Sequence, residues 1–247
     1  TWRYKSPGWW SLRGAVGQYS QAPQLDDFSP ITGGSELGFA RSRQAALGLD
    51  MALGGRVEFS VDGWWKDLQD VLTRLPGQAP AAVDGRAWGV EFSTRYRLRK
   101  RFFTWLSVNL GESLRDEAPF EYDQPFALNF VSSWTLSKQW TLGLRYRYAT
   151  GLPFTPLSHG VYDGTSNTYI PQSGTTNSER LSDYQKVDFR AERTWRFQRW
   201  TLAAYLEAWY VPSKNNSMYV VYSYDYSQRV FAAGPSFVPL VGLRGEL

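Results

Sequence analysis

Apolar and polar residues alternate with a period of two along most of this chain. Between Trp140 and Tyr148 the even positions hold tryptophan, leucine or tyrosine, and the odd positions hold threonine, glycine or arginine. The stretch from Trp88 to Leu98 alternates in the same way. Successive side chains of a β-strand point to opposite faces, so this period predicts strands with one apolar and one charged face.

About ten segments of the chain share this alternation, and nearly all are long enough for the roughly 9–11 tilted residues that cross a bilayer. The segments are 10–16, 43–53, 57–65, 88–98, 102–110, 126–136, 140–148, 187–195, 200–208 and 237–247. A single alternating strand is typical of an ordinary half-buried sheet. A succession of them indicates a larger all-β structure.

The connections between these segments alternate strictly between short and long. The short ones are Gly54-Gly55, Arg99–Arg101, Ser137–Gln139 and Phe197–Arg199, and the long ones are about 21–40, 71–86, 115–123, 152–183 and 212–236. Trp134, Trp140, Trp195 and Trp200 flank the short connections, where an interfacial aromatic girdle would lie. The sequence therefore predicts an all-β, antiparallel transmembrane β-barrel of about ten strands, with short periplasmic turns and long extracellular loops, as one domain over residues 1–247 of a bacterial outer-membrane protein.

Composition removes several other classes of protein. The chain has no run of eighteen apolar residues and a mean hydropathy of −0.43, which excludes a bundle of transmembrane helices. It contains no cysteine, which excludes disulfide scaffolds, thiolate zinc sites and thiol catalysis. The net charge of +4 is spread among acidic residues, so nucleic acid is not an expected partner.

The polar positions of the strands predict a charged inner face. We expect a lumen charge network there, built from Arg95, Arg97, Arg145, Arg147, Asp188, Arg190, Glu192, Glu207 and Arg244. Arg13, Asp50 and Asp62 share this face, as do the large aromatic residues Trp64, Phe103, Trp105, Tyr205 and Trp209. Because both charge signs are mixed, neighbouring strands can pair through Arg–carboxylate contacts in a narrow interior.

Candidate chemistry is confined to the long loops. The single histidine, His159, lies between Ser158 and Asp163, but a catalytic triad would need these residues on a rigid surface, and a solvated loop histidine is the simpler interpretation. Tyr222, Tyr224 and Tyr226 alternate in the last long loop and could stack against a ligand, although packing of their rings against neighbouring loops is the favoured interpretation. We expect no enzyme activity, metal site or cofactor.

Four segments carry a resemblance to a known family. They are SLRGAVGQYSQAPQLDDFSP at 11–30, WTLGLRYRYATGLPFTP at 140–156, NSERLSDYQKVDFRAERTW at 177–195 and the closing PLVGLRGEL. In order and over nearly the whole chain, they resemble the C-terminal part of the barrel of TonB-dependent outer-membrane receptors. That resemblance implies energised uptake of scarce nutrients through a 22-stranded barrel filled by a plug.

The chain departs from that family pattern, since we count only about ten strands, no plug, no TonB-binding segment, and Leu247 in place of a final aromatic residue. We therefore expect a small plug-less barrel whose lumen is filled by side chains and which has no active transport of its own. The alternatives are the C-terminal half of a larger uptake receptor and a barrel hydrolase that uses His159. The expected partners are outer-membrane lipid and the barrel-assembly machinery, with TonB only in a longer receptor.

Overall fold

The computed structural model describes residues 1–24, 38–73, 81–99, 101–211 and 216–247, and these residues form an all-β structure. They contain no helix that is long and apolar enough to cross a membrane. The strands are β1 (Trp2–Lys5), β2 (Trp10–Gln21), β3 (Ala40–Leu53), β4 (Val57–Thr73), β5 (Ala81–Leu98), β6 (Phe102–Arg115), β7 (Ala118–Pro119), β8 (Phe126–Thr135), β9 (Trp140–Ala149), β10 (Pro153–Phe154), β11 (Leu157–Asp163), β12 (Thr168–Ser173), β13 (Glu179–Arg180), β14 (Tyr184–Arg196), β15 (Thr201–Tyr210), β16 (Ser217–Tyr222), β17 (Arg229–Ala233) and β18 (Phe237–Glu246).

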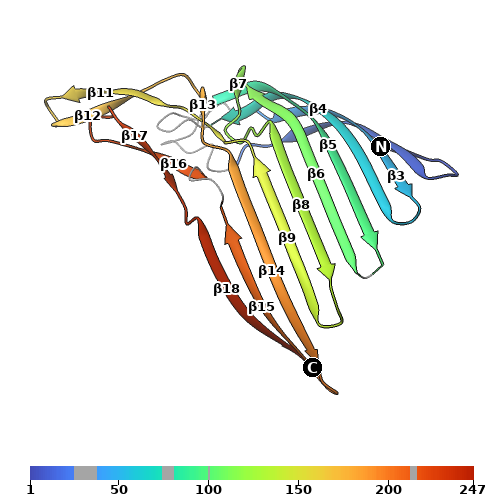
Figure 1. The fold of residues 1–247 in the computed structure, drawn as a ribbon. Helices are drawn as coiled ribbons and strands as arrows, with labels where there is room; N and C mark the ends of the chain where they lie inside the picture. The colour runs from blue at the N-terminus through green and yellow to red at the C-terminus, as the bar shows by residue number, and fades with distance from the viewer. Residues whose placement is uncertain (25–37, 74–80, 100, 212–215) are drawn as a thin grey trace.

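One twelve-stranded antiparallel sheet forms the body of the molecule. Its strands follow the order β1-β2-β3-β4-β5-β6-β8-β9-β14-β15-β18, and β7 pairs only with β6. The sheet curves as a single wall from the blue N-terminal strands to the red β18 (Figure 1). The prediction of antiparallel strands in sequential order is confirmed, and the ten long strands agree with the expected number.

The sheet is open among the residues that the structure describes. Its path begins at β1 and ends at β18, and these two strands do not pair with each other. With β7 off the path, the path holds eleven of the twelve strands, so in an alternating sheet β1 and β18 run in the same direction. The expected closure of about ten strands into a cylinder of their own is therefore wrong for this structure.

The strand ends at the short turns lie where the alternation predicted them. Gly54 and Gly55 adopt positive φ angles of 57° and 64°, which tight hairpin turns require and which glycine adopts without strain. The turn after β14 is closed by the amide of Phe197, which donates to the carbonyl oxygen of Trp200 at 2.9 Å. We call this edge of the sheet the short-turn end and the opposite edge the long-loop end.

At the long-loop end the strands extend further than the sequence predicted. β4 continues to Thr73 and β5 begins at Ala81, so part of the expected 71–86 loop is strand. The expected loops 152–183 and 212–236 contain the small sheets β10–β13, β11–β12 and β16–β17. Figure 1 shows the β11–β12 and β16–β17 hairpins projecting beyond the main sheet at this end.

One face of the sheet is apolar and has no protein layer against it among the described residues. Leu206 is 53% exposed and Leu243 is 74% exposed, although both lie within long strands. Buried apolar side chains are correspondingly scarce among the described residues, and they include Ala87, Leu114, Ala149, Pro153 and Ala203. A one-layer sheet of this kind requires lipid on its apolar face.

This asymmetry predicts opposite effects of one added charge on the two faces. In the intact protein, Leu206→Arg places a cation on the apolar face and should lower the free energy of unfolding by about 2–4 kcal/mol. Thr141→Arg adds the same charge on the polar face opposite Glu192 and should change it by well under half of that. Denaturant unfolding in phospholipid vesicles measures both values, and equal losses would contradict the assignment of faces.

Candidate functional site

The polar face of β14, β15 and β18 carries a connected series of ion pairs. The guanidinium of Arg190 contacts Glu207 at 3.2 Å, directly across the β14–β15 register, and contacts Glu192 on its own strand at 2.6 Å. Glu192 also accepts from Arg244 on β18 at 3.4 Å. Both carboxylates are only about a fifth exposed, so the pairs are partly shielded from solvent. Alternation placed these four residues on one face, and the structure brings them together.

Aromatic side chains extend this series along the strands. The guanidinium of Arg190 lies 3.8 Å from the ring centroid of Tyr205, and that ring occupies the space that a side chain at Gly242 would fill. Trp209 donates from Nε1 to Glu207 at 2.6 Å, and the ammonium of Lys186 lies 4.0 Å from the Trp209 ring centroid. Large aromatic residues on a charged face are thus covered by cations, which their ring faces attract.

The other members of the expected charge network make more local contacts. Arg95 pairs with Glu58 at 3.1 Å, and Asp188 pairs with Lys186 at 3.0 Å. Arg97 lies over the ring of Phe103 and Arg147 over the ring of Tyr184, at 5.7 and 5.6 Å. Arg145 stands opposite Asp188 in register. Lys186 was not among the nine predicted residues, although its even position in β14 places it on the polar face.

A second polar cluster lies on the same face near the other edge of the sheet. Arg13 contacts Asp50 at 2.8 Å and Asp62 at 2.6 Å, and so joins β2, β3 and β4. Its side chain must cross β3 to reach Asp62, and the register places Gly48 directly beneath it. A Cβ at Gly48 would lie 2.7 Å from Arg13 Nε, so the glycine provides the room for this contact.

The segments that carry the family resemblance meet at the long-loop end. Arg180 donates to the Asp123 carboxylate at 2.5 Å, to the Asp123 carbonyl oxygen at 2.8 Å and to the Gly151 carbonyl oxygen at 3.1 Å. Asp123 is 4% exposed and also accepts from the amide of Ser113 at 2.7 Å. This pair, whose carboxylate is buried, fixes the end of the 152–183 segment to the ends of the main strands. The pair was not predicted from the sequence.

Residue 151, whose carbonyl oxygen Arg180 contacts, must be glycine. A Cβ at Gly151 would overlap the backbone carbonyl oxygen of Leu181, which cannot move independently of the chain. The amide of Gly151 donates to Asp183 at 3.2 Å, and Asp183 also accepts from the hydroxyl of Tyr148. The amide of Leu181 donates to the carbonyl oxygen of Leu152 at 2.9 Å, so the two segments are in direct backbone contact.

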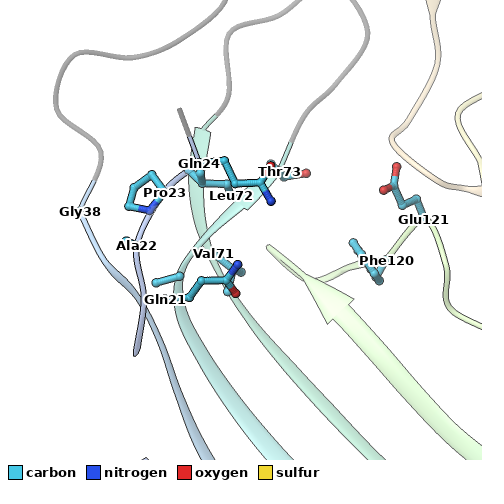
Figure 2. A pocket seen from close by; sticks show the side chains of 11 residues that line it. Gln21, Ala22, Pro23, Gln24, Gly38, Val71, Leu72, Thr73, Phe120 and Glu121 are labelled. Carbon is cyan, nitrogen blue, oxygen red and sulfur yellow. The ribbon is translucent and has the colours of Figure 1, made fainter. Parts of the chain in front are cut away.

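A cavity of about 330 Å³ opens at the long-loop end, above the ends of β2 and β4. Figure 2 shows Val71, Leu72 and Thr73 on one side of it and Phe120 and Glu121 across from them, on the connection that precedes β8. Its described lining consists of Gln21, Ala22, Pro23, Gln24, Gly38, Ala40, Val71, Leu72, Thr73, Phe120 and Glu121. The lining mixes amide, carboxylate and apolar groups, which suits a small polar ligand with an apolar part.

The loop tyrosines hold the β11–β12 and β16–β17 hairpins together. The amide of Leu157 donates to the hydroxyl of Tyr222 at 3.0 Å, and the Tyr224 hydroxyl donates to the carbonyl oxygen of Asn167 at 2.8 Å. The Tyr224 and Tyr169 rings meet edge to face at 5.5 Å, and Tyr226 lies 6.2 Å from Tyr222. Packing between loops therefore accounts for these contacts, while Tyr224 remains 69% exposed.

The structure does not bring the Ser–His–Asp candidates together. Ser158 Oγ lies 3.1 Å from His159 Nδ1, but Asp163 is four residues along β11, roughly 13 Å away at the rise of a strand. Asp163 instead accepts from the amide of Thr165 at 2.9 Å and from Ser166 at 2.7 Å. Those hydrogen bonds, that of Ser166 above all, lower the pKa of its carboxyl group.

The family model described as "TonB dependent receptor-like, beta-barrel" matches residues 2–207. The chain belongs to the TonB-dependent receptor β-barrel family. Its members are outer-membrane proteins, so the chain lies in the bacterial outer membrane with its apolar face toward lipid. The short-turn end is accordingly the periplasmic end. No curated protein matches the chain.

Solved structures of TonB-dependent receptors share the fold. The ferric-catecholate import receptor Fiu from E. coli K12 is 13% identical, with a TM-score of 0.61 over 99% of this chain and 34% of its own. The ferripyoverdine receptor of Pseudomonas aeruginosa is 14% identical, with a TM-score of 0.64 over 99% and 32%. The FrpB iron transporter from Neisseria meningitidis is 14% identical, with a TM-score of 0.61 over 99% and 38%. The chain thus spans about a third of the length of these receptors.

The two glycines at Gly151 and Gly143 provide a matched test of the junction. Gly151→Ala should lower the free energy of unfolding by about 1–3 kcal/mol, because the new methyl group meets backbone. Gly143→Ala has its nearest neighbour at an ordinary 3.6 Å and should change it far less. Denaturant unfolding of the intact protein measures both, and limited proteolysis within 152–183 should increase only for Gly151→Ala. Equal behaviour of the two variants would contradict this account.

The β16–β17 turn predicts a pH dependence. Ser223 Oγ donates to Asp225 at 2.6 Å and the Ser227 amide donates at 3.2 Å, which together lower the pKa of Asp225 to about 2. A carboxylate with a depressed pKa stabilises the turn fully above its usual value near 3.8 and loses that contribution as the pH falls through about 2. Carboxyl-carbon NMR should show Asp225 titrating near 2, and Ser223→Ala should move the titration upward. Titration of the unaltered protein near 3.8 would contradict the assignment.

Proposed function

We propose that this chain supplies part of the wall of a larger TonB-dependent receptor that takes up a scarce nutrient across the outer membrane. The observation that carries the proposal is the open sheet, whose edge strands β1 and β18 run in the same direction. Backbone groups at a free edge inside a bilayer are costly, so both edges need partner strands.

Strand direction argues against the small plug-less barrel that the sequence favoured. Bacterial outer-membrane barrels are antiparallel throughout and have an even number of strands. The eleven strands of the path could close only through a parallel β1–β18 pair. Additional strands between β18 and β1 remove this conflict, and the relatives of known structure, about three times as long, have room for them.

The polar face fits the inner wall of such a receptor. Its ion pairs and cation-covered rings form a rigid charged surface along β14, β15 and β18. In the family, a plug domain fills the interior of the larger barrel. We infer that the nine charged residues predicted for the lumen face this interior, and that contact with TonB belongs to the remainder of the receptor.

The long-loop end is the side from which a nutrient would enter. The cavity bounded by Val71, Phe120 and Glu121 lies at this end, as do the hairpins that carry Tyr222, Tyr224 and Tyr226. We infer that the cavity takes part in ligand capture. We also infer that the exposed ring of Tyr224 can contact the same ligand. A hydrolase is not favoured, because Asp163 is separated from His159 along β11.

Cysteine cross-linking tests whether the two edges meet. In the intact protein, Arg3→Cys on β1 combined with Val238→Cys, Leu240→Cys or Arg244→Cys on β18 should give no disulfide, because a disulfide needs Cα atoms within about 7 Å. Tyr4→Cys with Leu12→Cys, which are register partners on β1 and β2, is the positive control. A disulfide between β1 and β18 would overturn the proposal in favour of the small closed barrel.

A further inference from the structure

One arginine, Arg193, lies on the apolar face of the sheet. In β14 the apolar face is formed by alternate residues, and Arg193 follows Phe189 and Ala191 in that series. The register places it between Trp140 on β9 and Ala204 on β15, both of which are also on the apolar face. Arg193 therefore shares the lipid-facing surface with leucines and tryptophans.

The contacts of Arg193 are aromatic. Its guanidinium carbon lies 4.9 Å from the ring centroid of Trp195 and 5.6 Å from that of Trp140. Its Nε atom is buried and has no hydrogen-bond partner in the described part of the chain. Arg190 lies three residues before Arg193 on the same strand and on the opposite face, where it pairs with two carboxylates. The two rings contact the guanidinium, but no carboxylate among the described residues pairs with it.

The depth of Arg193 places it at the membrane interface. Trp140 is the first residue of β9, and the amide of Thr194 donates to the carbonyl oxygen of Gln139 in the adjacent short turn at 2.8 Å. On the β9 side this row is thus the last before the short turn, and on the β15 side one further apolar pair, Trp195 and Leu202, follows it. A charge in the hydrocarbon layer is costly, whereas at the interface a guanidinium can reach the headgroups.

The surroundings of Arg193 favour an anion. The flanking turns 136–139 and 197–200 contain Lys138 and Arg199 and no acidic residue. Trp140 and Trp200 are each about two-fifths exposed, as expected for rings at the headgroup level. Above Arg193 the apolar face continues through Ala191 and the exposed Leu206, so a lipid chain can lie along the strand while its headgroup meets the cation.

We propose that Arg193, held between Trp140 and Trp195, binds the phosphate of an anionic phospholipid in the periplasmic leaflet. The guanidinium offers donors that match phosphate oxygens, and the two rings fix its orientation before the lipid arrives. The site lies on the outside of the wall and is separate from nutrient uptake, so it does not depend on the proposed function.

Native mass spectrometry of the intact protein, released from detergent with added lipid, tests this site. We expect phosphatidylglycerol to be retained in preference to phosphatidylcholine. Arg193→Gln should weaken retention of phosphatidylglycerol about fivefold, the factor expected for one arginine at an anionic surface. Arg101→Gln removes the same charge from another short turn, between β5 and β6, and should leave retention within twofold of the unaltered protein as a rough limit.

Several results would overturn the proposal. Equal losses for Arg193→Gln and Arg101→Gln would indicate a diffuse charge effect, and equal retention of the two lipids would indicate no recognition of the anionic headgroup. Displacement of phosphatidylglycerol by equimolar inorganic phosphate would indicate a free-anion site. A band that shifts on boiling before electrophoresis reports folding of each variant. If Arg193→Gln does not fold, Trp195→Leu keeps the charge, removes the stacking ring and should also weaken retention.

Discussion

Lateral pairing of strands is the constraint on which this structure depends. The main sheet is one layer thick, so few apolar side chains of the described residues are buried in a protein core. Stability must therefore come from inter-strand hydrogen bonds, cross-strand contacts and the lipid against the apolar face. The same constraint applies to the two edges of the sheet, because β1 and β18 each present a row of backbone groups without a partner strand in the described sheet.

Side-chain contacts on the polar face run across strands as well as along them. Arg13 bridges three strands over Gly48, and Arg190 and Arg244 share Glu192 between two strands that are not neighbours in the sheet. Glycines at the crossing points leave room for an arginine or an aromatic ring to lie flat on the next strand. These contacts join neighbouring strands at fixed register, and a one-residue slip would move every charge to the lipid side.

The sequence predicted the membrane-spanning part well, because alternation there has a physical cause. Every second residue meets lipid, so segments such as 140–148 and 187–195 match β9 and β14 closely at the short-turn end. Beyond the bilayer both faces meet water or other loops, the pattern disappears, and the extensions of β4 and β5 and the hairpins β11–β12 and β16–β17 were interpreted as loops.

The polar contacts also fall into a group that the alternation predicts and a group that it does not. Arg190, Glu192 and Glu207 share a face within two consecutive strands, so alternation alone predicts their proximity. Arg180 and Asp123 come from different loops, and neither spacing nor periodicity relates them. Arg180 lies in a segment that resembles the family and Asp123 does not, so the resemblance did not indicate a contact either. The prediction that the strands close into a barrel was wrong because Trp2–Lys5 was not counted as a strand. With it, the path holds eleven strands, an odd number.

The uneven length of the connections bears on how the wall is assembled. From β1 to β9 each strand follows its neighbour in the chain, and every pairing beside a short turn closes a small loop. β9 meets β14 only after residues 150–183, and β15 meets β18 only after 211–236. Joining distant segments carries a larger loss of chain entropy, so we expect the β9–β14 and β15–β18 pairings to form more slowly than the short hairpins. Arg180 and the tyrosines that join the hairpins lie on those two connections, and their contacts reduce the length of chain left free within each of them.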